Sequence, residues 1–232
     1  MESRVKQDFC FLAVTGPTAS GKTAWAESFA AERGLELANA DPFQLYREIP
    51  ILGNQPKAAK NWHFLSDRSL QQAATAGSFA KEAEPHLKKP WLWVGAGLYL
   101  GALLYGLDSP GKKGTPFQGR PRFENYRIFV LNPNRQTLYD RIDQRVEEMI
   151  QKGAFEEAEV IWKGVQAGEF SASLPGLKAI GLRQLLSFFA GDLSRDRAIE
   201  LWKQETRRLA KRQLTWLRKF SAPSERIQWI DL

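Results

Sequence analysis

The chain has 232 residues, enough to bury a sizeable core, and its 43% apolar and 12% aromatic content is that of a globular protein. Its single cysteine, Cys10, excludes a disulfide framework and a zinc site built mainly from cysteines. The formal charge is +7, and the N-terminus lacks the layout of a signal peptide, so we expect a cytoplasmic protein with a polyanionic partner.

Apolar runs and glycine or proline punctuation predict the elements in chain order. Strands are expected where short apolar runs end at glycine or turn residues: 9–15, 35–38, 91–94 and 126–131. Helices are expected over 23–33, 73–87, 98–107, 134–151, 153–167, 177–190 and 194–220. Residues 42–72 contain several prolines and glycines and give no clear periodicity.

The first strand is followed by Gly16-Pro17-Thr18-Ala19-Ser20-Gly21-Lys22-Thr23. A loop of this pattern between a strand and a helix turns several backbone N–H groups towards phosphate oxygens. Lys22 adds a positive charge, and the Thr23 hydroxyl is placed to bind a magnesium ion that bridges the phosphates. The loop therefore predicts a site for a diphosphate or triphosphate without saying which.

Strands and helices alternate through residue 150, which predicts an α/β fold: a parallel sheet like that of P-loop NTPases, flanked by helices. A helical region follows at the C-terminus. We expect one core formed by residues 1–107 and 122–232, joined by a proline- and glycine-rich connector at 108–121. Thr15, Asp41 and Gly95 each fall at the end of a predicted strand, so they should share the rim where such sheets bind ligands.

The last helix carries two kinds of residue. Seven basic residues and one acid, Glu205, lie between Lys203 and Lys219. A packing stripe recurs at helical spacing: Trp202, Thr206, Leu209, Gln213, Trp216 and Phe220. Arg207, Lys211 and Arg218 form a neighbouring ridge that suits a phosphate backbone, although a solvated helix face has the same composition.

Several motifs in this order resemble the tRNA dimethylallyltransferase family. Besides the phosphate loop, they are Asp41-Pro42-Phe43-Gln44-Leu45-Tyr46-Arg47, His63-Phe64-Leu65-Ser66-Asp67, Val94-Gly95-Ala96-Gly97-Leu98-Tyr99, Arg141-Ile142-Asp143-Gln144-Arg145, Ala179-Ile180-Gly181-Leu182-Arg183-Gln184 and the segment 206–218. The resemblance covers most of 9–107 and 126–220. The segment 206–218 is its most specific part.

The resemblance implies a prenyl transferase in which the loop holds dimethylallyl diphosphate and the acceptor is the adenosine beside the anticodon of tRNA. Asp41 would be the general base, and Lys22, Arg141 and Mg²⁺ would neutralise the leaving diphosphate. The implied diphosphate-binding residues are Gly16, Thr18, Ala19, Ser20, Gly21, Lys22, Thr23 and Arg145, with Thr23 also holding the metal. The implied tRNA-binding residues are Gln44, Arg183, Arg207, Lys211, Arg212 and Arg218. A monomer is expected.

The sequence departs from the family pattern at two places. Ala96 stands where family members carry a threonine, and the connector 108–121 replaces a longer helical insert. The residues therefore leave other functions open: prenyl transfer to a free adenine nucleotide, a small-molecule kinase that uses ATP, or an inactive RNA-binding protein. His63, Trp91 and Trp93 are expected to be structural residues.

Overall fold

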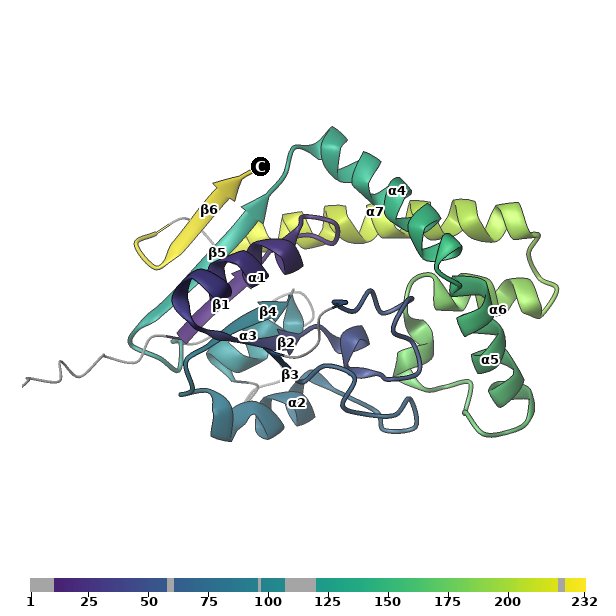
Figure 1. Cartoon of the computed structure of the whole chain (residues 1–232), viewed down its shortest axis with the longest axis horizontal. Helices are drawn as coiled ribbons and strands as arrows, with labels where there is room; N and C mark the ends of the chain where they lie inside the picture. The colour runs from purple at the N-terminus through teal and green to yellow at the C-terminus, as the bar shows by residue number, and fades with distance from the viewer. Residues whose placement is uncertain (1–10, 58–60, 96, 107–119, 221–223) are drawn as a thin grey trace, which may run out of the picture.

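The structure is a computed structural model that describes residues 11–57, 61–95, 97–106, 120–220 and 224–232 (Figure 1). Its described part contains one six-stranded parallel sheet with the order β3-β2-β4-β1-β5-β6. The strands are β1 (Phe11–Thr15), β2 (Glu36–Ala40), β3 (Trp62–His63), β4 (Trp91–Gly95), β5 (Tyr126–Asn132) and β6 (Ile227–Asp231). The predicted α/β fold is therefore correct.

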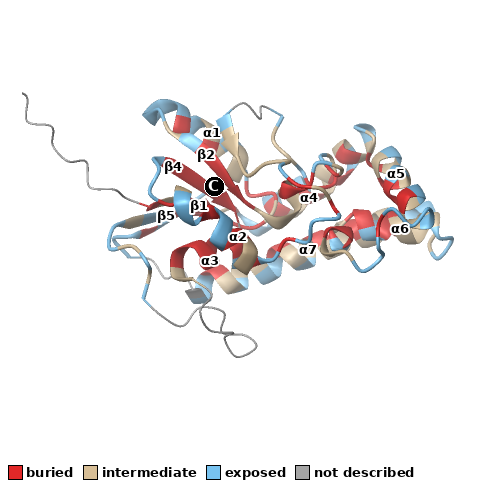
Figure 2. Ribbon diagram, turned by 90° about the horizontal axis from the view of Figure 1, so that it is seen from below, coloured by how far each residue is buried: buried red, intermediate tan, exposed pale blue. Residues whose placement is uncertain are grey.

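The two faces of the sheet are covered by different helices. Leu12 and Val14 of β1 face one apolar cluster together with α1 (Lys22–Arg33), whereas Phe11 and Ala13 face the other. The second face packs against α2 (Ala76–Ala83) and α3 (Leu98–Tyr105). This alternation follows from the two-residue period of a strand. Figure 2 shows the central strands largely buried between these layers.

Four helices form a unit that extends beyond one end of the sheet, and the C-terminal part of one of them, α7 (Arg195–Phe220), runs alongside the sheet (Figure 1). The other three are α4 (Arg135–Gln151), α5 (Ala154–Gln166) and α6 (Leu182–Phe189). Helix α7 contacts α4 and α6, and α5 contacts α4 and α6, so the four form a continuous helical unit. Among the described residues, no helix combines the length and the apolar character needed to cross a membrane.

Most predicted elements occur within one to three residues of their expected bounds. The 73–87 helix divides into α2 and a short 3-10 helix, η3 (Glu84–His86), because Pro85 lacks the N–H that would continue the α-helix. The 177–190 helix begins only at Leu182, after the 3-10 helix η4 (Pro175–Lys178). Strands β3 and β6 and the 3-10 helix η1 (Pro42–Leu45) were not predicted.

The backbones of β4 and β2 approach each other closely at the rim of the sheet, where both strands end. A Cβ atom on Gly95, the last residue of β4, would lie 2.4 Å from the carbonyl oxygen of Ala40. Only glycine fits there, so β4 and β2 end side by side and Asp41 follows directly. Ala96 lies outside the described residues, as do residues 107–119, which include most of the predicted connector.

Candidate active site

The phosphate loop runs from the end of β1 to the start of α1. Gly16 has no room for a side chain, since a Cβ atom would lie 2.9 Å from the Leu131 carbonyl oxygen. Ala19 has φ 63° and Gly21 has φ 87°, so the chain curls tightly before Lys22 begins the helix. Such a curl followed by a helix N-terminus directs N–H groups and positive potential into the space above the loop.

Lys22 is folded over its own loop. Its Nζ donates hydrogen bonds to the carbonyl oxygens of Gly16, at 3.0 Å, and Pro17, at 2.8 Å. Burial lowers the pKa of Lys22 to about 8, the nearby carboxylate of Asp41 opposes that shift, and the Arg145 cation adds to it. The three charged groups therefore belong to one electrostatic site.

Asp41 follows β2 and caps η1. Its Oδ1 accepts a hydrogen bond of 3.0 Å from the Phe43 N–H, and the buried side chain of Asn39 accepts one of 2.9 Å from the Asp41 N–H. Burial raises the pKa of Asp41 above its ordinary value, while the Phe43 N–H and the charge of Lys22 oppose the rise. Asp41 is thus both a helix cap and a half-buried carboxylate beside the phosphate loop.

A cavity of about 360 Å³ opens above the loop. Its polar wall is formed by loop residues 18–23 together with Asp41, Gln44, Arg145 and Gln213. Its apolar lining is formed by side chains from α4, from α7 and from the turn before α6: Ile142, Val146, Met149, Ile180, Trp202 and Leu209. One cavity therefore offers charged groups for phosphates and apolar side chains for hydrocarbon.

The two arginines predicted on α4 lie differently. Arg145 lines this cavity, and its Nη1 donates a 3.2 Å hydrogen bond to the Thr18 hydroxyl. Arg141 is exposed one turn away and lines an adjoining cavity beside Ala19 and Trp25. Burial lowers the pKa of Arg145, and the carboxylates of Glu148 and Asp41 oppose that shift. The shared helix face was predicted correctly, but Arg145 rather than Arg141 reaches Asp41 and Lys22.

Helix α7 meets the phosphate loop directly. The Thr18 N–H donates a 2.7 Å hydrogen bond to Oε1 of Gln213, which also lines the cavity. Trp202, Thr206 and Leu209 from the predicted packing stripe line the same cavity. Gln213 was missed as a site residue because the spacing placed it in an apolar stripe, although an amide in such a stripe is itself a signal of a polar partner.

The basic residues predicted to bind tRNA fall into two groups. Arg207 is paired with Asp143 of α4, and Arg183 is paired with Glu205. The remaining three are exposed along α7: Lys211, Arg212 and Arg218. Lys211 and Arg218 line a second cavity with Arg135 and Tyr139 of α4. The structure thus brings Lys211 and Arg218 together and turns Arg207 towards the protein.

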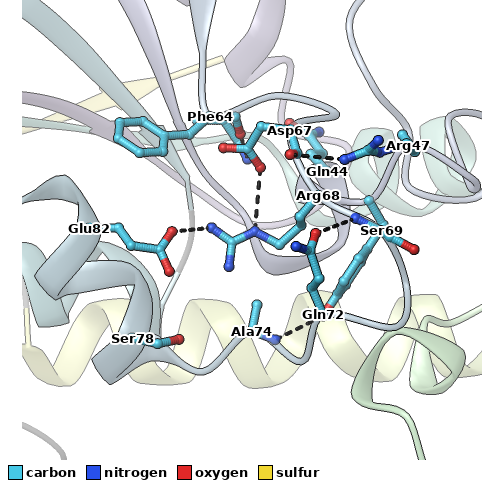
Figure 3. Close-up of polar contacts among 12 residues, drawn as sticks. Gln44, Arg47, Phe64, Asp67, Arg68, Ser69, Gln72, Ala74, Ser78 and Glu82 are labelled. Carbon is cyan, nitrogen blue, oxygen red and sulfur yellow. Dashed lines mark hydrogen bonds and ion pairs between the residues drawn. The ribbon is translucent and has the colours of Figure 1, made fainter.

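Gln44 lies on η1, at the edge of the cavity, and its Nε2 donates to the Asn54 carbonyl oxygen at 2.8 Å. Buried Arg68 holds the segment that carries Gln44, because the Arg68 backbone N–H donates to the Leu45 carbonyl oxygen. Figure 3 shows the Arg68 guanidinium between the carboxylates of Asp67 and Glu82. Gln44 is therefore held at a fixed place on the cavity rim.

Two hydroxyl groups at the loop have no hydrogen-bond partner among the described residues. They are Oγ1 of Thr15, at the end of β1, and Oγ of Ser20, whose residue is fully buried and lines the cavity. Buried hydroxyls normally have partners, so a group that enters the cavity would meet a donor already in place. His63, in contrast, bonds to Glu36 and stacks on Trp91 at the amino ends of the strands, away from the cavity.

Comparison with known proteins gives one consistent result. A family model described as IPP transferase matches residues 111–220. The chain is 31% identical to a tRNA dimethylallyltransferase of Salinibacter ruber, over 90% of this chain and 85% of the relative. It is 33% identical to a tRNA dimethylallyltransferase of Oenococcus oeni, over 95% of this chain and 88% of the relative.

The two alignments differ in length. The alignment with the Salinibacter ruber protein extends over 281 positions, more than the 232 residues of this chain, so that relative contains residues absent here. The alignment with the Oenococcus oeni protein extends over only 236 positions. The Oenococcus oeni relative therefore adds few positions within the aligned region.

Solved structures show the same fold. The crystal structure of a full-length tRNA isopentenylpyrophosphate transferase from Bacillus halodurans superposes with a TM-score of 0.80 at 21% identity and covers 96% of this chain and 90% of its own. A eukaryotic dimethylallyltransferase acting on tRNA superposes with a TM-score of 0.79 at 18% identity, covering 95% of this chain and 73% of its own.

Proposed function

Because the chain belongs to the tRNA dimethylallyltransferase family, we propose that it transfers a dimethylallyl group from dimethylallyl diphosphate to the exocyclic amine of the adenosine beside the anticodon in tRNA. The observation that carries the proposal is the shared cavity of the phosphate loop, Asp41 and helix α7. Its charged lining residues suit the diphosphate, and its apolar lining residues suit the five-carbon chain.

In the proposed reaction, the amine nitrogen of adenosine forms a bond to the allylic carbon, while the bond from that carbon to the diphosphate oxygen breaks. Asp41 accepts the proton lost by the amine, and diphosphate leaves with the electron pair. Lys22 and Arg145 neutralise the negative charge that grows on the leaving group. Arg145 takes the role first expected of Arg141, because Arg145 lies in the same cavity as Asp41.

A magnesium ion fits this site. Thr23 lines the cavity, and a magnesium ion bound to phosphates needs few protein ligands because waters and phosphate oxygens complete its shell. The ion would add positive charge next to the leaving diphosphate. No cluster of three or more His, Cys, Asp or Glu side chains suited to a metal occurs in the described residues, so Thr23 would act with the diphosphate itself.

We further propose that the tRNA anticodon stem-loop lies along α7. Lys211, Arg212 and Arg218 are exposed there, and Gln44 lines the cavity. The target base must leave its stack to reach the half-buried carboxylate of Asp41. A monomer and a cytoplasmic location remain predictions from the sequence.

The test of Asp41 is its replacement by asparagine, which keeps the size and the hydrogen bond to Phe43 but removes the proton acceptor. We expect Asp41→Asn to lower the single-turnover rate on an anticodon stem-loop by about a hundredfold or more. The affinity for the stem-loop should stay near that of the wild type. A near wild-type rate would show that Asp41 is not the base.

The same assay separates the other candidate functions. Wild-type protein is incubated with dimethylallyl diphosphate, Mg²⁺ and either the stem-loop or AMP, and products are separated by mass. Product with AMP alone would overturn the tRNA reaction. Phosphate transfer from ATP would support a kinase, and RNA binding without turnover would support an inactive RNA-binding protein.

A further inference from the structure

A single hydrogen bond joins the phosphate loop to a helix far away in the sequence. The backbone N–H of Thr18 donates to Oε1 of Gln213 at 2.7 Å, across 195 residues. An N–H in a phosphate loop is a group that such loops commonly direct at phosphate. In this chain the amide side chain of Gln213 accepts from it instead.

Other contacts hold the same corner of the loop. The Thr18 hydroxyl accepts from Arg145, and Ala19, which is only 4% exposed, packs in an apolar cluster with Ile142 and Ala210. Ala19 is in the left-handed region of the backbone map, where a residue with a side chain stays only if its surroundings hold it. Helices α4 and α7 therefore clamp the corner, and Gln213 fixes its backbone.

The bond to Thr18 also fixes the orientation of the Gln213 amide. Because an N–H donor must face the oxygen, the NH₂ group of Gln213 points elsewhere. Within the described residues Gln213 makes no other hydrogen bond, and its side chain lines the cavity above the loop. A neutral donor is thus presented beside the groups expected to bind diphosphate.

We propose that Gln213 is a positioning residue for the diphosphate, although it lies within the basic segment of α7 that is expected to bind RNA. Its oxygen holds the Thr18 corner of the loop, and its NH₂ group faces the ligand. Gln213 lies on the inner stripe with Trp202, Thr206 and Leu209, not on the exposed side with Lys211 and Arg218. This inference rests on the proposed function, since it assigns a role at the same site.

The experiment measures two affinities in the same preparations: that of inorganic pyrophosphate with Mg²⁺, by calorimetry, and that of an anticodon stem-loop, by fluorescence anisotropy. Gln213→Met keeps the length of the side chain and removes the oxygen acceptor and the NH₂ donors. We expect this variant to bind pyrophosphate about tenfold more weakly, with unchanged stem-loop affinity. Gln166→Met, an exposed glutamine at the end of α5, is the matched control and should change neither affinity.

Gln213→Glu serves if Gln213→Met does not fold. A glutamate can still accept from the Thr18 N–H but places a negative charge beside the diphosphate, so pyrophosphate binding should fall while the fold is kept. Pyrophosphate affinity equal to that of the wild type in either folded variant overturns the inference, as does a selective loss of stem-loop binding. If the wild-type protein itself does not bind pyrophosphate, the diphosphate site of the proposed function fails, and this inference fails with it.

Discussion

At the scale of single residues, the site depends on keeping Lys22 positive and Asp41 negative although both are partly removed from solvent. Burial shifts both groups towards their neutral forms, since it lowers the pKa of Lys22 to about 8 and raises that of Asp41. The charge of each group opposes the shift of the other, and the Phe43 N–H further opposes the shift of Asp41. Activity should therefore be lost on the acid side as Asp41 gains a proton and on the alkaline side as Lys22 loses one.

We expect kcat/KM for dimethylallyl diphosphate to fall above about pH 8, approaching about a tenfold loss per pH unit, because this parameter reports the ionisation of the enzyme form that has not yet bound the donor. The measurement is the initial rate at low donor concentration and saturating stem-loop. The activity that remains in Lys22→Arg should not fall above about pH 8, since a guanidinium stays charged. A wild-type profile that is flat to about pH 9.5 would contradict the prediction.

The positions of the loop residues were predictable from sequence because the loop is local: spacing alone places Lys22 and Thr23 at a helix N-terminus. Spacing also put Arg141 and Arg145 on one helix face. It did not show which of them reaches the cavity, because that depends on where α4 crosses the loop. The ion pair of Arg207 with Asp143 could not be predicted either, because it depends on how two helices far apart in the chain pack against each other.

At the scale of elements, one wall of the cavity is held by the side chain of Gln55. Its Nε2 donates to the carbonyl oxygens of Gln44, at 3.2 Å, and Tyr46, at 2.8 Å, and its Oε1 accepts from the Ser66 hydroxyl. These bonds join the turn that carries Gln55 to residues 44–46 and to residue 66. The preceding turn is anchored separately, because Glu157 of α5 accepts from the backbone N–H groups of residues 51 and 52.

We expect Gln55→Leu to lower the free energy of unfolding by about 1 to 3 kcal/mol, because three hydrogen bonds are lost and two carbonyl oxygens lose a donor. The rate on the stem-loop at low RNA concentration should fall about tenfold as Gln44 loses its fixed place, with donor KM little changed. Urea unfolding and steady-state rates check this, with exposed Lys57→Ala as the control. Unchanged stability in Gln55→Leu would contradict it.

Elements with strong periodicity or clear punctuation were predictable, and those that depend on distant partners were not. Gly34 ends α1 in the left-handed conformation, as expected of a glycine after a helix. Strand β6, in contrast, has only five residues and forms by pairing with β5 nearly a hundred residues earlier. Residues 42–72 gave no pattern because their shape comes from bonds between segments, such as those of Gln55 and Arg68.

At the scale of the whole molecule, α7 joins the two parts of the proposed reaction. One side of the helix closes the cavity through Trp202, Thr206 and Gln213, and the other side exposes Lys211 and Arg218. Not all of the basic residues are available to bind RNA. Arg207 forms an ion pair with Asp143, and the solvent-exposed fractions of the two side chains are 31% and 41%. Exposure, rather than composition, is therefore the ground on which Lys211 and Arg218 are proposed to bind RNA.

This division predicts different salt dependences for two sets of variants. Lys211→Ala with Arg218→Ala should weaken stem-loop binding and reduce the slope of log K against log salt by about 1.5, since each phosphate contact contributes about 0.7 to 0.9. Arg207→Ala should leave that slope unchanged and lower the free energy of unfolding by about 0.5 kcal/mol, the scale of a partly exposed ion pair. Anisotropy titrations over a range of salt concentrations give the slopes, and urea unfolding gives the stability. If Arg207→Ala reduced the slope as much as the double variant, the ion pair with Asp143 would have to open on RNA binding, and the division of α7 into two sides would be wrong.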